Sequence, residues 1–182
     1  MTPEQRMQDD GDYLRACRRV LAAGIVARAR AELLAIAPER WPGDAATLRT
    51  RLAAAASGGP PEAELEMLDP GHDVQRGLAT CLDLAIGTDD ELSAALLQLQ
   101  LDGARVRFVF EETAMRLRGD AVRYAHAAAH GWLLKRLTEV KVLLRMRRHE
   151  EARAALAAFR AAAHEHVRVM DAEPDRGGDG GG

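Results

Sequence analysis

Length, composition and charge restrict the fold before any motif is considered. A chain of 182 residues is long enough to bury a hydrophobic core without disulfides or a structural metal. Its abundant alanine and arginine favour helices, whereas aromatic residues, which favour strands, make up only 4% of the chain, and the net charge is −3. The composition therefore predicts an all-α fold with an aliphatic core and argues against a strand-rich or disulfide-stapled protein.

Apolar residues at helical spacing predict one bundle-like domain of five or six helices over residues 1–172. The expected helices cover residues 12–37, 45–56, 73–86, 89–118, 120–145 and 149–170. Charged and apolar residues alternate briefly after Gly103, as they do in a strand, but a lone strand would have no partner, so helix is expected there. The glycine-rich residues 173–182 contain no apolar side chain and should be disordered.

The first and third helices carry clear local patterns. Residues three and four apart predict the buried face of the first helix, namely Tyr13, Cys17, Val20, Gly24, Ala27, Ala31 and Leu34. Gly87 should end the third helix and Thr88 should begin the fourth, because Thr88 and Glu91 have the spacing of a capping box. Cys17 and Cys81 have no CxxC partner and should be buried in their helices.

The last two helices are expected to form an antiparallel hairpin with a turn near residues 147 and 148. The predicted inner face of the fifth helix contains Val122, His126, Ala129, Leu133, Val140 and Leu144. The predicted inner face of the sixth helix contains Ala152, Leu156, Phe159, Ala163, His166 and Met170.

Charge is distributed unevenly along the chain. Residues 1–104 carry 10 basic and 17 acidic side chains, whereas residues 105–153 carry 12 basic and 6 acidic ones. The basic segment could bind the acidic half of its own chain, an acidic surface of another protein, or nucleic acid. Core packing is one interpretation of Trp132, and partner binding is the other. Because arginine and tryptophan are enriched at the energetic centres of interfaces, the predicted partner contacts are Arg116, Arg118, Arg123, Trp132, Arg145, Arg147 and Arg148.

Four histidines provide an alternative site. His126 and His130 lie four residues apart and therefore share a helix face, an arrangement that can chelate a transition metal. In the expected hairpin they lie level with His164 and His166 of the next helix, so the four histidines form a candidate metal site. His164 and His166 diverge by about 200° around a helix, so only one of them can point toward the first pair.

Two family resemblances centre on the same histidines. The stretch DAVRYAHAAAHG, residues 120–131, resembles the histidine phosphotransfer domains, helical bundles with an exposed histidine, although the lysine that follows this histidine by three residues is replaced by Ala129. Arg123 and His130, with six residues between them, are similar to the arginine and histidine of the HEPN ribonucleases. The resemblances imply phosphotransfer-like chemistry or RNA cleavage at His126 and His130.

Other enzyme signatures are missing from the sequence, which contains no GxxxxGK[ST], GxGxxG, HExxH or GxSxG motif. We therefore expect a non-catalytic accessory, adaptor or regulatory protein that acts through protein–protein contacts and needs no cofactor. The N-terminus is polar and acidic, and no run of 18 apolar residues exists, so we expect a cytoplasmic location and no membrane insertion.

Overall fold

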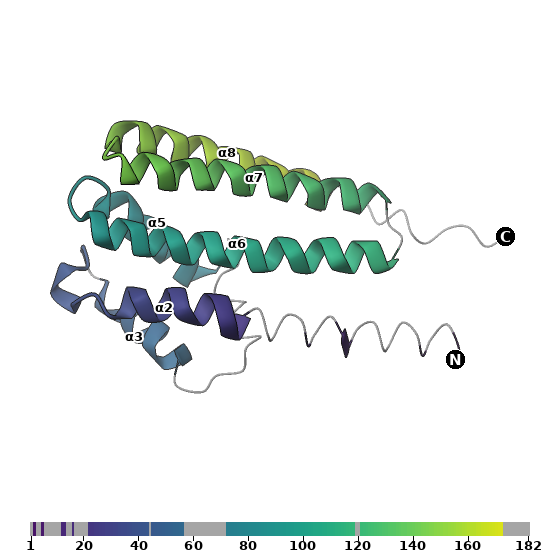
Figure 1. Cartoon of the computed structure of the whole chain (residues 1–182), viewed down its shortest axis with the longest axis horizontal. Coiled ribbons are helices and arrows are strands. Elements are labelled where there is room, and N and C mark those ends of the chain that lie inside the picture. Colours follow the sequence, from purple (N-terminus) through teal and green to yellow (C-terminus); the bar gives the residue numbers. More distant parts are fainter. Residues whose placement is uncertain are drawn as a thin grey trace.

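The computed structural model describes residues 22–43, 45–56, 72–118 and 121–172, together with Thr2, Gln5, Asp12, Tyr13 and Ala16 (Figure 1). Within the long ranges, side chains are described for residues 24–43, 45–54, 72–106 and 131–165. Residues 57–71 between the second and third predicted helices, the predicted tail, Cys17 and Val20 lie outside the described residues.

Helices account for the regular structure of the described residues, which contain no strand, so the all-α prediction is confirmed. A π-helical turn, η1 (Ala22–Val26), leads into α2 (Ala27–Leu34), and a short 3₁₀ turn, η2 (Pro38–Arg40), follows. The remaining helices are α3 (Ala46–Ala56), α5 (Asp73–Ala85), α6 (Asp90–Arg118), α7 (Ala121–Arg145) and α8 (His149–Ala172). None of the helices in the described part of the chain is both long and apolar enough to span a membrane.

Helix α6 occupies the centre of the arrangement. It packs against α2, α5 and α7, and α8 packs against α7 (Figure 1). Helices α7 and α8 lie on one side of α6, and α2 and α3 lie on the other. Arg160 of α8 donates to Asp83 of α5 over 2.6 Å, so α8 also lies alongside α5.

The core is aliphatic, as the composition predicts, and most of its large side chains are leucines. From α6 alone, the side chains that are almost inaccessible to solvent are Leu92, Leu96, Leu97, Leu99, Leu101 and Val106. Cys81 is also buried, as expected, with its thiol unpaired. Burial of a leucine side chain stabilises a fold by roughly 1.5–3 kcal/mol, so α6 makes a large contribution to the packing of the described core.

The predicted inner faces of α7 and α8 agree with the structure at the described side chains except Ala163, which is half-buried and lies outside the core cluster. Leu133, Val140 and Leu144 of α7 are buried, and so are Ala152 and Leu156 of α8, while Phe159 packs against the same core. The other members of the two predicted faces that lie outside the described side chains are Val122, His126, Ala129, His166 and Met170.

The predicted buried face of the first helix is wrong at three of its described members, whereas Ala27 is half-buried and Leu34 is half-buried and packs against the core. Tyr13, Gly24 and Ala31 are exposed, and the face that packs against the core consists of Val26, Ala29, Arg30 and Leu33. The physical reason is the size of the side chains, because burying Val26 and Leu33 removes more apolar surface from water than burying glycine and alanine does. The predicted pattern matched helical spacing but consisted mostly of small residues.

In the turn between α5 and α6, the predicted capping box at Thr88 is wrong, because a different residue caps α6. Gly87 ends the turn with a φ of +84°, as expected for a glycine after a helix. The N-cap of α6 is Asp89, whose Oδ1 accepts from the Leu92 amide over 3.1 Å. Thr88 instead donates its hydroxyl back to the Leu84 carbonyl over 2.9 Å. The carboxylate is the better acceptor for the helix terminus, which shifts the cap by one residue.

The turn between α7 and α8 closes through two backbone hydrogen bonds. The Arg147 amide donates to the Leu144 carbonyl, and the Arg148 amide donates to the Leu143 carbonyl, each over 3.0 Å. This pairing is a Schellman motif, which places Arg147 at the left-handed position with a φ of +56°. Helices α7 and α8 therefore double back on each other after a very short connection.

The φ of +84° at Gly87 generates a stability prediction. Gly87→Ala should lower the free energy of unfolding by about 1–2 kcal/mol, because an L side chain is strained in the left-handed region. Gly24→Ala is the matched control: it lies in a helical turn with nothing within 4 Å of the added Cβ, so it should raise stability by about 0.5–1 kcal/mol. Urea unfolding followed by circular dichroism measures both values, and equal effects of the two substitutions would contradict the assignment.

Candidate protein-interaction surface

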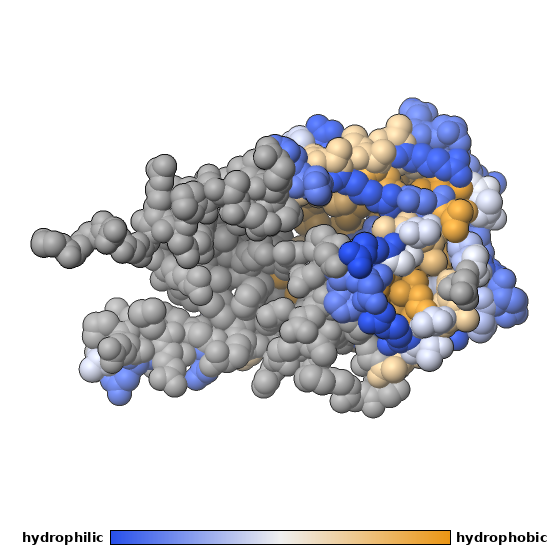
Figure 2. All heavy atoms as spheres, turned by 180° about the vertical axis from the view of Figure 1, so that it is seen from behind, coloured by the Kyte–Doolittle hydropathy of each residue, from blue (hydrophilic) through white to orange (hydrophobic). Residues whose placement is uncertain are grey.

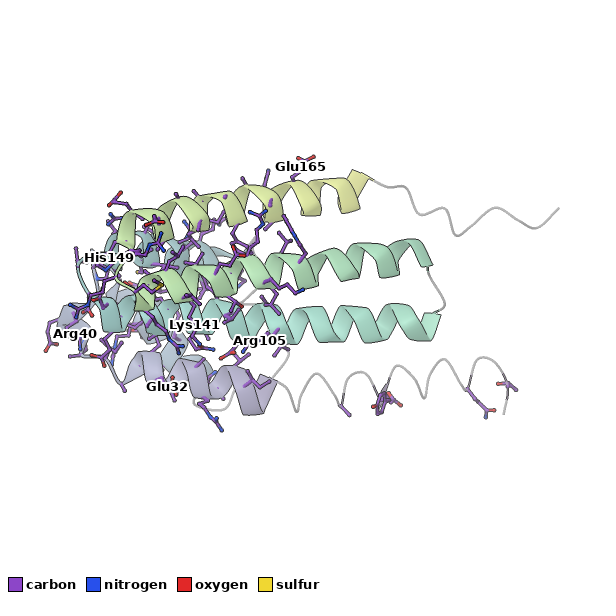
Figure 3. All side chains as sticks on the ribbon, turned by 45° about the horizontal axis from the view of Figure 1, so that its top comes forward. Glu32, Arg40, Arg105, Lys141, His149 and Glu165 are labelled. Atoms are coloured by element: carbon purple, nitrogen blue, oxygen red, sulfur yellow. The ribbon has the colours of Figure 1, made fainter. Side chains whose placement is uncertain are left out.

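Helix α7 has two chemically different long faces. One face is inserted in the core through Leu133, Leu137, Val140 and Leu144. At the edge of this face, Lys141 donates to the Gln98 side chain of α6, which fixes how α7 is rotated against α6 (Figure 3). The opposite face is turned toward solvent.

The outward face of α7 carries five exposed residues at alternating steps of three and four, Trp132, Lys135, Glu139, Val142 and Met146. We call this set the α7 seam. Such spacing places all five on one stripe of the helix, like the a and d positions of a coiled coil. Met146 follows the last residue of α7, but its amide still donates to the Val142 carbonyl over 3.0 Å, so the helical path continues through it.

Three of the seam residues are large and apolar, yet about half of each is exposed: Trp132 (51%), Val142 (49%) and Met146 (58%). Exposure of this size at Trp132 shows that its core-packing interpretation is wrong. The Arg136 guanidinium carbon lies 4.2 Å from the centroid of the Trp132 ring, a cation–π contact that holds the indole along the helix surface.

Three large apolar side chains of the described residues are exposed away from α7, namely Tyr13, Ile25 and Leu84. Leu84 of α5 is 51% exposed, and its neighbours Asp83 and Thr80 are polar. Figure 2, which views the molecule from behind, shows hydrophilic residues with hydrophobic ones between them over the described part of the chain. Scattered apolar residues are normal on protein surfaces, whereas a periodic stripe on one helix calls for an explanation.

The predicted basic edge is partly paired within the chain. Arg147 lies 3.4 Å from Asp90, and Arg148 pairs with Glu151 at the start of α8. Arg145 is exposed, and Trp132 lies on the seam. The side chains of Arg116, Arg118 and Arg123 lie outside the described residues, so their predicted role stays a prediction. Of the three predicted arginines whose side chains are described, Arg147 and Arg148 thus contact acidic residues of their own chain.

These pairs belong to a network at the end of the bundle where the helices turn (Figure 3). His149 Nε2 lies 2.9 Å from Asp90 Oδ1, which joins the α7–α8 turn to the start of α6. Arg40 clamps Asp89 with two hydrogen bonds of 2.7 and 2.9 Å and also donates to Glu91 over 2.9 Å. The hydrogen bonds from Arg40 lower the pKa of the Asp89 carboxyl below its usual value. The ion pairs therefore anchor the end of α7 on which the seam is displayed.

The histidine alternative is not assembled in the part of the chain whose side chains are described. His164 is exposed on α8, and the side chains of His126, His130 and His166 lie outside the described residues. Among the described residues, no group of three or more histidine, cysteine, aspartate or glutamate side chains is arranged to hold a metal ion. The four-histidine site, and the phosphotransfer and ribonuclease resemblances that share it, stay predictions.

Sequence reasoning predicted a contact role for Trp132 but did not single out the other exposed residues of the α7 seam, Lys135, Glu139, Val142 and Met146. The 3-4-3-4 spacing was visible, but two of its five positions are charged, which hides the stripe from any search for apolar periodicity. The exposed face could have been found by assigning the leucines and valine at helical spacing to the inner face of α7 and then noting which apolar residues lie on the opposite face.

Comparisons with known proteins do not extend these findings. No family model, no curated protein and no solved structure matches the chain.

The lowered pKa of Asp89 generates a pH prediction. A lowered carboxyl pKa stabilises the fold above the unfolded value of about 3.9, and this stabilisation is lost as the pH falls through the folded value. Asp89→Asn keeps a side-chain cap for α6 but removes the charge that Arg40 binds. The difference in unfolding free energy between wild type and Asp89→Asn should therefore be largest near pH 7 and should disappear as the pH falls below about 4.

Asp89→Ala is the control for the helix cap. It removes the cap as well as the charge, so it should be less stable than Asp89→Asn by about 1 kcal/mol. Urea unfolding between pH 3 and 7 provides the measurement. A difference between wild type and Asp89→Asn that does not change with pH would show that the ion pair with Arg40 is not the source.

Proposed function

We propose that this chain is a non-catalytic protein-interaction module, an accessory, adaptor or regulatory protein of the cytoplasm, and that it binds its partner through the α7 seam. The observation that carries the proposal is the half-exposure of Trp132, Val142 and Met146 at periodic positions of one helix. A partner that covers them would remove apolar surface from water, which stabilises a complex by roughly 25 cal/mol per Å² before the costs of association.

Tryptophan and arginine at the same point of the seam support the proposal further. These residue types dominate the energetic centres of protein interfaces. The Arg136 side chain already lies over the Trp132 ring, so the pair is ordered before binding and loses less side-chain entropy when a partner docks.

A protein suits this surface better than nucleic acid does. Glu139 lies in the middle of the seam, where its carboxylate would repel phosphates. Arg147 and Arg148, next to the seam, are already paired with carboxylates of the chain. Lys135, Arg136 and Arg145 remain exposed beside apolar side chains, a combination that fits a partner with apolar and acidic groups at its contact surface.

Site-specific photocrosslinking tests the proposal. A benzoylphenylalanine introduced at position 142 of the full chain, in cells of the source organism, should produce a defined crosslinked protein that mass spectrometry identifies. Position 161, where exposed Ala161 lies on α8, is the matched control and should give no such product. Trp132→Asp should abolish the product from position 142 by placing an unpaired charge in the contact.

Two results would contradict the proposal. Equal crosslinking from positions 142 and 161 would show non-specific encounters. No crosslinked protein from position 142, with the chain folded and expressed, would show that the seam is not an interface.

A further inference from the structure

The α7 seam is complementary to itself when two copies run in opposite directions. In an antiparallel pair of helices, a positions pack against d positions of the partner. With a two-fold axis near residue 137, residues whose numbers sum to 274 lie opposite each other. Trp132 then meets the partner's Val142, and Lys135 meets the partner's Glu139. Each contact occurs twice, as an isologous interface requires.

Both kinds of contact in this register are favourable. The apolar residues cover one another, so the exposed surface of Trp132 and Val142 is removed from water. The charged residues form two oppositely charged pairs between the two copies, because each Lys135 lies opposite the partner's Glu139. Among Trp132, Lys135, Glu139 and Val142, no charged side chain therefore lies opposite a like charge or an apolar side chain.

The parallel alternative is unfavourable for the same residues. A parallel, in-register pair would place Lys135 opposite the partner's Lys135 and Glu139 opposite the partner's Glu139. Like charges facing each other across an interface are repulsive, and charged positions in a coiled-coil seam commonly fix orientation and register in this way. The charges that interrupt the apolar stripe therefore select one orientation.

We propose that the partner bound by the α7 seam is a second copy of this chain, packed antiparallel through α7. The inference rests on the proposed function, which it deepens by naming the partner. The seam from Trp132 to Met146 is about 21 Å long at 1.5 Å per residue, so the contact is at the small end of specific interfaces. The dimer should accordingly be reversible, with a dissociation constant on the order of 1–100 μM.

Sedimentation equilibrium of the full chain over about 1–300 μM tests this pairing. Wild type should change from monomer to dimer with concentration. Lys135→Glu and Glu139→Lys should each raise the dissociation constant about tenfold or more, because each creates like-charge pairs across the two-fold axis. The double variant Lys135→Glu/Glu139→Lys restores opposite charges in both pairs and should recover most of the wild-type dissociation constant.

Matched controls separate the seam from general charge effects. Arg76→Glu on α5 and Glu32→Lys on α2 make the same charge changes at exposed positions away from the seam and should leave the dissociation constant unchanged. Circular dichroism checks that every variant is folded. A dimer that the charge variants do not weaken, or a double variant no better than the single ones, would overturn the antiparallel pairing.

The outcome also distinguishes this inference from the proposed function. A chain that stays monomeric at 300 μM while position 142 crosslinks to a different protein would overturn self-association and leave the proposed function intact. A monomeric chain with no crosslink from position 142 would overturn both. A crosslink from position 142 to a second copy of the chain would support both.

Discussion

Burial of α6 is the constraint on which the rest of the structure depends. Its leucines contact α2, α5 and α7 at once, and even Asp102, beside Gly103, is almost fully buried. Three helices surround α6, and α8 packs against α7 and contacts α5 through Arg160 and Asp83. No described helix then remains to cover the outer face of α7. The exposed seam is thus a consequence of placing one apolar helix at the centre of the bundle.

The ends of the helices show how that arrangement is held. Asp89 caps α6 and accepts two hydrogen bonds from Arg40 of η2. The next residue, Asp90, lies within hydrogen-bond distance of His149 at the start of α8. The Arg40–Asp89 and His149–Asp90 contacts join residues 49 and 59 positions apart in the sequence. Adjacent carboxylates therefore tie both halves of the chain to the start of the central helix, which explains why part of the basic segment faces its own acidic residues.

The sequence predicted the helices and the inner faces of α7 and α8 because leucine and valine are large enough to dominate their burial. It did not predict the buried face of α2, where a regular series of small residues competed with Val26 and Leu33. The seam of α7 was hidden for a related reason. The helix has apolar residues on both sides, and only the contacts with α6 and α8 decide which side is inside. Long-range pairs such as Arg40 with Asp89 leave no local pattern at all.

The central claim is that Trp132 is exposed on the single chain and is covered by association. Acrylamide quenching of its fluorescence, taken as the difference between wild type and Trp132→Phe, measures this directly. We expect strong quenching in dilute solution, typical of an exposed indole, and progressively weaker quenching as the protein concentration rises. A Trp132 that is quenched as poorly as the buried Trp41 at every concentration would contradict it.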